Sequence, residues 1–407
     1  MKNKKILIIS HQFLPFVSPR TTRWSLLIDE LTKRGNEVTV LTGTAPEELK
    51  KNYEVLYFGN KKFSSNINKV RSDSQDSSNN YLKKIIYSML KTIYRFLFKT
   101  FSWPDYAMFW AFTIFKNRKR IENKFDAIIS VSLPFTSHLC AYILQKRISA
   151  DWYMDIGDPF SLKINSPENN KIIYSYLNKY YEQKFYQNAS KIIFTHNEVA
   201  ELHQNKFNID RKKIVIGYPI ALLNEKRIKN SLTFNYKDTP LKIGYFGAFT
   251  KSVREPNNYI INIANSLDDE IKHEWYIHNE SKKFFSSIKN ISSHQFLDIL
   301  PRELALETMV NKMHVLLSIG NFNKYQMPSK VIEYLSLGKP VLHFAEIEDD
   351  PLYNFSNLFD NLKIINSKTT KNELDNYFEN IRENRIELDV VNFNNNFSAT
   401  ELINNLI

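Results

Sequence analysis

Short runs of apolar residues recur through the first half of the chain. They lie at 6–9, 38–41, 126–131, 152–155, 191–195 and 214–216, and polar or turn-forming residues bound each of them. Uninterrupted apolar runs of this length are typical of parallel strands, because helices cover both faces of such a sheet. The segment 21–33 has instead a helical period, with Trp24, Leu27, Ile28 and Leu31 on one face and Gly35 placed to end the helix. This alternation predicts a doubly wound α/β domain.

The same alternation begins again in the second half. Strands are expected at 242–247, 275–277, 315–318 and 341–344, and helices at 257–267, 303–311 and 330–337. A mixed polar stretch with Pro219 and Pro240 separates the halves. We therefore expect an α/β fold of two tandem Rossmann-like domains with a cleft between them. The predicted boundaries are 1–216 for the first domain, 217–240 for a linker, 241–385 for the second domain, and 386–407 for a C-terminal helix that returns to the first.

The segment 327–341, MPSKVIEYLSLGKPV, carries the clearest chemistry. A strand is expected to end near Ser318, and Ser329 can cap the helix that follows. Ligands of open α/β sheets bind at the carboxyl ends of the strands, where free N–H groups and a lysine suit a phosphate. Lys330 supplies that charge, and Glu333 could accept two hydrogen bonds from a ribose. The alternative is an ordinary amphipathic helix with Glu333 on its solvated face.

This segment resembles the donor-binding helix of the family 4-like glycosyltransferases of GT-B fold. Further stretches resemble the capsule, O-antigen and exopolysaccharide members of that family, in the same order along the chain. They are RGNEVTV at 34–40, SLPFTSHL at 132–139, DIGDPF at 155–160, and the strand and phosphate loop at 241–256. The resemblance covers about residues 5–345 and is weak between 45 and 100.

The resemblance implies a nucleotide-sugar site in the second domain. The residues it points to are Gly247, Tyr325, Pro328, Ser329, Lys330 and Glu333, with Glu333 binding the nucleotide ribose. Many members have a second glutamate eight positions earlier, where this chain has Tyr325. The arginine usual after the loop glycine is Ala248 here, which leaves Lys251 and Arg254 as the best partners for a diphosphate. We assign catalytic roles to Lys251, Arg254 and Lys330, because cations aimed at a leaving diphosphate stabilise the transition state.

The first domain is expected to face the acceptor. In its first loop, Ser18, Pro19 and Arg20 replace the glycine pair of the family, so Arg20 and Arg23 could supply charge there. His138, Asp155 and Asp158 complete this acceptor-side set with Ser18. For His138, a position at a helix start or in the core is the alternative. The two aspartates could equally be structural.

Composition limits the other possibilities. The chain of 407 residues has a net charge of +12, which favours an anionic partner. Its single cysteine excludes a disulfide framework and a zinc site built from cysteines, and the nine histidines have no metal-ligand spacing. We expect no metal and no cofactor, with a UDP- or GDP-linked sugar as substrate. The sequence has no secretory signal and no apolar stretch long enough to span a bilayer.

The segment 81–124 combines positive charge with bulky apolar residues. It has ten Lys or Arg residues against Asp105 and Glu122, interleaved with aromatic and aliphatic side chains. Such a mixture at near-helical spacing suits an anionic membrane surface. A helix packed on the first domain with a solvated basic face is the alternative. Nucleic-acid binding is the weakest reading, because no known nucleic-acid motif accompanies the charge.

These observations predict an enzyme that moves a sugar from a nucleotide-sugar donor to a glycan acceptor, lipid-linked, in surface polysaccharide synthesis. The resemblance implies retention of configuration and independence of metal. We expect it in the cytoplasm, peripheral on the inner face of the plasma membrane. Two alternatives stay open: a sugar-nucleotide epimerase of GT-B fold, and a non-catalytic, membrane-associated assembly subunit. A dinucleotide dehydrogenase is disfavoured, because the first strand is not followed by GxGxxG.

Overall fold

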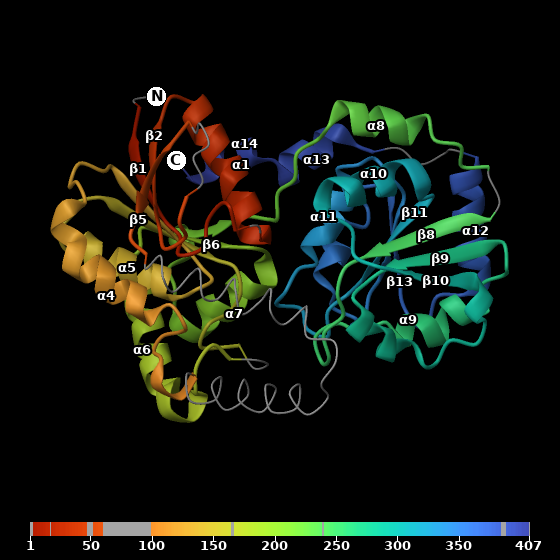
Figure 1. Cartoon of the computed structure of the whole chain (residues 1–407), viewed down its shortest axis with the longest axis horizontal. Coiled ribbons are helices and arrows are strands. Elements are labelled where there is room, and N and C mark those ends of the chain that lie inside the picture. Colours follow the sequence, from red (N-terminus) through yellow and green to blue (C-terminus); the bar gives the residue numbers. More distant parts are fainter. Residues whose placement is uncertain are drawn as a thin grey trace, which may run out of the picture. The chain divides into compact units, whose positions relative to one another are not determined.

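A computed structural model describes residues 3–16, 18–46, 52–59, 99–163, 167–237, 240–383 and 388–406. The chain divides into two compact units, Met1–Gly217 with Ile403–Ile407, and Tyr218–Leu402. Each unit contains one parallel sheet with helices packed on it (Figure 1). The predicted fold class, two tandem Rossmann-like α/β domains, is confirmed.

The first unit contains a seven-stranded sheet in the order β3-β2-β1-β4-β5-β6-β7. Its strands are β1 (Lys5–Ile9), β2 (Glu37–Thr42), β3 (Glu54–Tyr57), β4 (Ala127–Val131), β5 (Asp151–Ile156), β6 (Lys191–Phe194) and β7 (Ile214–Ile216). Its helices are α1 (Pro19–Lys33), α4 (Met108–Asn117), α5 (Thr136–Gln145), α6 (Lys171–Asn188) and α7 (Asn197–Phe207). β1 lies between β2 and β4, with Ile6 paired to Val38 on one side and Ala127 on the other. The apolar runs found in the sequence are thus the buried central strands.

The second unit contains a six-stranded sheet in the order β10-β9-β8-β11-β12-β13. Its strands are β8 (Leu241–Phe246), β9 (Ile271–Tyr276), β10 (His294–Leu297), β11 (Val315–Ile319), β12 (Val341–Phe344) and β13 (Leu362–Ile365). Its helices are α8 (Glu225–Leu232), α9 (Asn257–Asn262), α10 (Arg302–Lys312), α11 (Ser329–Leu335), α12 (Lys371–Arg382) and α13 (Val390–Phe397), and α14 (Ala399–Leu406) ends the chain. All paired strands are parallel, so their carboxyl ends share one edge.

The stretch between the two sheets forms part of the second unit. The division falls after Gly217, and α8 packs against α10. Ser231 donates to the carbonyl oxygen of Leu337 at 2.7 Å, and Arg227 pairs with Glu303 at 2.6 Å. The segment that we expected to be a linker, 217–240, thus contains a helix that a buried serine and an ion pair attach to the helices of the second unit.

The end of the chain belongs to the first unit. The Lys191 ammonium donates to the carbonyl oxygens of Asn405 and Leu406, at 3.0 and 2.8 Å. The guanidinium of Arg34 donates to Asn404 Oδ1 at 2.8 Å. Lys191 thus satisfies backbone carbonyl groups at the C-terminal end of α14, where the helix itself provides no partner.

One predicted helix is shorter than expected. The segment 257–267 forms α9 only as far as Asn262, and a 3-10 turn, Ala264–Ser266, follows. Ser266 Oγ donates to the carbonyl oxygen of Ile263 at 2.7 Å. A serine that bonds to the nearby backbone in this way competes with the helical pattern.

Candidate functional site

A group of charged side chains in the second unit lies at the carboxyl ends of β8 and β11. The strand order reverses between these two strands, since β9 and β10 extend to one side and β12 and β13 to the other. Such a reversal leaves a crevice above the sheet, where ligands of open α/β proteins bind. The loops 247–256 and 320–328 follow β8 and β11, so they lie at this reversal of the strand order.

Gly247 and Lys330 meet at the end of β8. The ammonium of Lys330, in the first turn of α11, donates to the carbonyl oxygen of Phe246. A side chain at position 247 would collide with this ammonium, so the approach of Lys330 depends on glycine there. Tyr334, one turn further along α11, donates to the same carbonyl oxygen at 3.4 Å. The β8 carboxyl end and α11 are therefore held together around one backbone oxygen.

Arg254 adds a second cation to this place. A tight turn fixes it, in which Thr250 and Arg254 exchange backbone hydrogen bonds of 3.0 and 2.9 Å. Burial and, to a lesser extent, the positive charge of Arg254 lower the pKa of Lys330 to about 8, against the opposing effect of Glu333. Arg254 Nε is buried without a hydrogen-bond partner in the described part of the chain.

Neither cation is neutralised by an ion pair. Among the described residues, no carboxylate oxygen lies within 4.0 Å of the charged nitrogens of Lys330 or Arg254. Two neighbouring cations without an ion-pair partner favour the binding of an anion with more than one negative charge. Lys251, in the same turn, is exposed to solvent.

Helix α11 begins without a side-chain cap. Its cap position is Pro328, and Ser329 is the first helical residue. The expectation that Ser329 caps this helix is wrong, because the chain enters helical geometry one residue earlier than the sequence suggested. Proline has no side-chain acceptor, so no side chain satisfies the first N–H groups of α11.

Glu333 lies on the half-buried side of α11 and already has a partner. Its Oε1 accepts from the guanidinium of Arg302, on α10, at 2.6 Å. Oε2 accepts no hydrogen bond from the residues that the structure describes. The residue is therefore held in one orientation with a free acceptor.

Tyr325 takes the place of the carboxylate that the family often has. It is half-buried in the loop after β11, where its backbone N–H donates to Asn323 Oδ1 at 3.1 Å. The ammonium of Lys324, which pairs with Asp349 at 2.7 Å, lies 6.0 Å from the centre of its ring.

Sequence reasoning missed Glu346, which lies at the same edge of the sheet. It comes two residues after β12, and its Oε2 accepts from Asn258, at the start of α9, at 2.7 Å. Burial, the largest effect, and the nearby carboxylate of Glu255 raise the pKa of Glu346 to about 7, against the opposing hydrogen bond from Asn258. The feature of the sequence that could have identified Glu346 is its position directly after an apolar strand.

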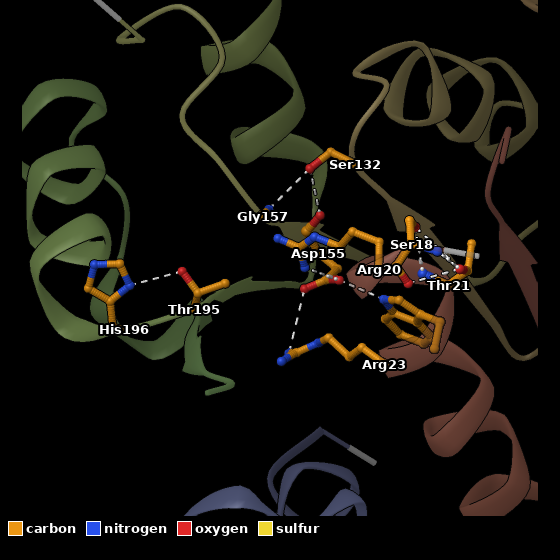
Figure 2. Close-up of polar contacts among 10 residues, drawn as sticks. Ser18, Arg20, Thr21, Arg23, Ser132, Asp155, Gly157, Thr195 and His196 are labelled. Atoms are coloured by element: carbon orange, nitrogen blue, oxygen red, sulfur yellow. Dashed lines mark hydrogen bonds and ion pairs between the residues drawn. The ribbon is translucent and has the colours of Figure 1, made fainter. Parts of the chain in front are cut away.

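In the first unit, Asp155 anchors a cluster of cations at the end of β5. Its carboxylate is buried, and Oδ2 accepts from Arg20 at 3.0 Å and from the indole of Trp24 at 2.6 Å. Arg23 lies 3.8 Å from Oδ1. Arg20 and Arg23 extend from α1 toward two sides of this carboxylate (Figure 2). Asp155 therefore positions both arginines.

The loop after β5 is shaped around Arg20. A side chain at position 157 would overlap the Arg20 guanidinium, so glycine is needed there. The N–H of Gly157 donates to Ser132 Oγ at 3.2 Å, and Ser132 Oγ donates to the carbonyl oxygen of Asp155 at 3.0 Å. The arginine keeps about a quarter of its side chain exposed, 23%, whereas Arg23 keeps 6%. Of the two, Arg20 is the one that a ligand can reach.

The other predicted acceptor-side residues lie in different surroundings. Ser18 caps α1, where it exchanges hydrogen bonds with Thr21, Ser18 N to Thr21 Oγ1 at 2.7 Å and Thr21 N to Ser18 Oγ at 3.2 Å. His138 is fully buried, and its Nδ1 lies 2.7 Å from Ser130 Oγ. Burial lowers the pKa of His138 to about 3. His138 therefore lies in the core, which was the alternative to an acceptor-side role. Asp158 is half-buried in the turn after β5.

The basic aromatic segment 81–124 is described in part. Residues 81–98 lie outside the described residues, and α4 occupies 108–117. On α4, Trp110, Ala111 and Ile114 are buried, whereas Phe109, Phe112 and Phe115 are exposed. The exposed phenylalanines recur every three residues, so they share one side of the helix.

The described parts of the chain contain neither a metal-ligand cluster nor a membrane-spanning helix. No group of three or more His, Cys, Asp or Glu side chains there could hold a metal ion. Within the same ranges, no helix has the length and apolar character needed to cross a bilayer.

Comparison with known proteins gives matches in structure and none in sequence. No protein-family model and no curated protein sequence matches the chain. A glycosyltransferase from Rickettsia africae is similar over 99% of this chain and 97% of its own, with TM-score 0.62 and 13% identity. Anabaena HepE, solved with UDP and glucose, is similar over 98% and 97%, with TM-score 0.56 and 10% identity. The lipopolysaccharide outer core galactosyltransferase WaaB is similar over 98% and 97%, with TM-score 0.55 and 12% identity.

Proposed function

We infer the function from the GT-B fold, which the chain shares with these glycosyltransferase structures along nearly its whole length. We propose that the protein is a glycosyltransferase that moves a sugar from a nucleotide-sugar donor to a glycan acceptor. The observation that carries the proposal is the pair Lys330 and Arg254, two cations at the strand-order reversal of the second sheet for which the described residues provide no ion-pair partner. A nucleoside diphosphate supplies the negative charge that this pair lacks.

The pair would act on the leaving group. Breaking the bond between sugar and diphosphate leaves negative charge on the phosphate oxygens. Cations already fixed at that place stabilise the charge without reorganising. Lys330 is held by the Phe246 carbonyl oxygen and Arg254 by its turn, so both are in place before the donor binds. The exposed Lys251 would add a third, more mobile charge.

Glu333 would bind the ribose of the donor. Arg302 occupies one carboxylate oxygen and holds the side chain in place, which leaves Oε2 to accept from a ribose hydroxyl. Tyr325 replaces an acidic side chain, so sugar hydroxyls would meet a phenol in that loop. UDP is the first nucleotide to test, because HepE was solved with UDP and glucose.

The first unit would bind the acceptor, with Arg20 as the accessible charge. A lipid-diphosphate-linked glycan fits an arginine held by a buried carboxylate, since guanidinium binds phosphate in two-point contacts. We further propose retention of configuration, no requirement for metal, and a role in surface polysaccharide synthesis at the inner face of the plasma membrane. The WaaB structure, from lipopolysaccharide synthesis, supports that pathway class.

A screen of UDP- and GDP-linked sugars tests the proposal. We expect one donor to be hydrolysed slowly by the protein alone and to be transferred once acceptor is added. Lys330→Gln and Arg254→Gln should each lower turnover strongly, and Lys272→Gln, an exposed lysine of the same unit, should not. Conversion of the donor to an epimer without acceptor would support the epimerase alternative. Absence of binding to any donor would support the non-catalytic subunit.

A further inference from the structure

Helix α6 presents an apolar face to solvent. Its packed side contains the buried residues Asn178, Glu182, Phe185 and Tyr186. The opposite side contains Ile172, Ile173, Tyr176 and Tyr180, with exposed fractions of 94%, 55%, 80% and 47%. At 100° per residue these four positions fall within a single stripe. The apolar character is therefore on the solvent side of the helix, where amphipathic helices of globular proteins are polar.

Phe101 lies in a stretch of the chain that is hydrogen-bonded to the first turns of α6. The backbone N–H of Asn170 donates to the carbonyl oxygen of Lys99 at 3.0 Å, and Tyr174 Oη donates to that of Thr100 at 2.9 Å. The same stretch is fixed further on, where Trp103 Nε1 donates to Asn178 Oδ1 at 3.0 Å. Phe101 is nevertheless 71% exposed. Phe101 therefore adds an exposed aromatic side chain in a stretch that is attached to α6.

The charged side chains of α6 determine the electrostatic character of this face. The lysines of α6 are Lys171, Lys179 and Lys184, and its single acidic residue, Glu182, is buried and accepts from Tyr186 Oη at 2.8 Å. Every exposed charge of α6 is thus positive. The four-residue stretch before the helix adds Glu168, which pairs with Lys163 at 2.8 Å.

We propose that the outward face of α6, together with Phe101, docks the first unit on an anionic lipid bilayer. Ile172, Ile173 and Phe101 would enter the boundary between head groups and acyl chains. The tyrosines would lie at the head groups, with their rings in the apolar layer and their hydroxyls in water. The lysines would contact lipid phosphates.

A second copy of this chain fits the face less well than a bilayer. A two-fold contact places the same patch on both subunits, which would bring the lysines of the two copies together. An anionic surface neutralises these lysines and buries the apolar stripe in one step. Phe101 belongs to the segment 81–124, whereas α6 is a surface that the sequence did not point to. The proposal does not depend on the transfer reaction.

Vesicle flotation of the full chain tests this proposal. We expect binding to vesicles that contain phosphatidylglycerol, weaker binding to phosphatidylcholine alone, and loss at high salt. The triple variant Ile172→Ser, Ile173→Ser, Tyr176→Ser should lower the partition coefficient at least roughly tenfold, since it removes three large apolar side chains. The control is Ile261→Ser with Ile291→Ser, which removes apolar side chains that are 56% and 65% exposed in the second unit. It should bind as the wild type does.

Charge reversal tests the electrostatic part separately. Lys171→Glu with Lys179→Glu keeps the apolar stripe and should weaken binding to anionic vesicles while binding to neutral ones changes little. The proposal fails if the wild type binds neither kind of vesicle, or if the triple variant binds as the wild type does. It also fails if the wild type is a dimer in solution that the triple variant converts to a monomer, because a second copy would then be the occupant.

Discussion

The surroundings of Lys330 bring its pKa close to neutral pH, so its charge changes within the physiological range. Its ammonium is held at a backbone carbonyl oxygen and beside Arg254, and its pKa is lowered to about 8. This arrangement would favour the binding of a diphosphate. The repulsion between the two cations is relieved when the anion binds, so binding and charge are coupled.

This coupling predicts that nucleotide affinity depends on pH. The diphosphate needs the charged lysine, so affinity should be highest below about pH 7 and should fall as the pH rises through about 8. Calorimetric titration of UDP at a series of pH values measures this. Lys330→Gln should bind more weakly and show a flat profile over the same range. A wild-type profile that is flat between about pH 7 and about 9.5 would remove Lys330 from the diphosphate site.

Glu333 yields a second prediction at this scale. Glu333→Ala should weaken nucleotide binding by about 1–3 kcal/mol, because hydrogen bonds from ribose hydroxyls to a charged acceptor are lost. Arg302→Ala should have a smaller effect, since it keeps the carboxylate and only frees its orientation. The same titrations give both values. Equal affinities for Glu333→Ala and the wild type would mean that the ribose is bound elsewhere.

At the scale of helices and strands, Lys339 connects the segment after α8 to the start of β11. Its side chain is fully buried, and its ammonium donates to the carbonyl oxygen of Met313 at 2.9 Å. The same ammonium lies 3.5 Å from the ring centre of Phe234 and 5.0 Å from that of Tyr236. Burial lowers the pKa of Lys339 to about 7. The lysine joins these elements, but burial makes its charged form less stable than it is in water.

Lys339 therefore predicts how stability depends on pH. Between the folded pKa of about 7 and the ordinary value of 10.5, the unfolded chain binds the proton and the folded chain does not. The free energy of unfolding should rise with pH in this window and receive no slope from Lys339 below it. Urea unfolding at several pH values, compared between the wild type and Lys339→Met, isolates this contribution. The variant should lack part of the rise, and parallel curves would contradict the assignment.

The elements that the sequence predicted are those with continuous apolar runs. Central strands such as β1 and β4 are buried along nearly all of their length, so their runs are uninterrupted. The strands it missed, β3, β10 and β13, are edge strands with half-exposed positions, and their patterns are mixed. Edge strands are covered less completely, so selection for apolar residues is weaker there.

The sequence located parts of the candidate site with unequal success. It placed Gly247, Arg254 and Lys330 near one another, because strand ends at one edge of a parallel sheet meet. It could not foresee that Arg302 from α10 occupies Glu333, or that Asp155 is the buried anchor of Arg20 and Arg23. Those contacts join residues far apart in the chain, and no local pattern encodes them. Tertiary packing also decided that His138 lies in the core.

At the scale of the whole molecule, each unit contributes its own charged cluster, and the chain passes between the units twice. The second passage is completed when residues 403–407 join the first unit. The contacts of Lys191 and Arg34 with the last turn of α14 fix this end. The C-terminus is thereby part of the first unit's structure.

This attachment is testable. Lys191→Met should destabilise the docked C-terminal turn by about 1 kcal/mol, the order of a hydrogen bond lost at a half-buried site. Hydrogen–deuterium exchange of residues 403–406 should become faster. Lys206→Met, which changes an exposed lysine of α7, serves as the control and should leave the exchange unchanged. Equal exchange in both variants would show that Lys191 does not hold this segment.

The most direct test of the account is calorimetric titration of UDP and GDP into the full chain. We predict that at least one of them binds. The double variant Lys330→Gln with Arg254→Gln should lose roughly 100-fold in affinity or more, because two charge-assisted contacts disappear. Lys272→Gln should bind as the wild type does. Binding of neither nucleotide, or unchanged affinity in the double variant, would contradict the assignment of the diphosphate to this pair of cations.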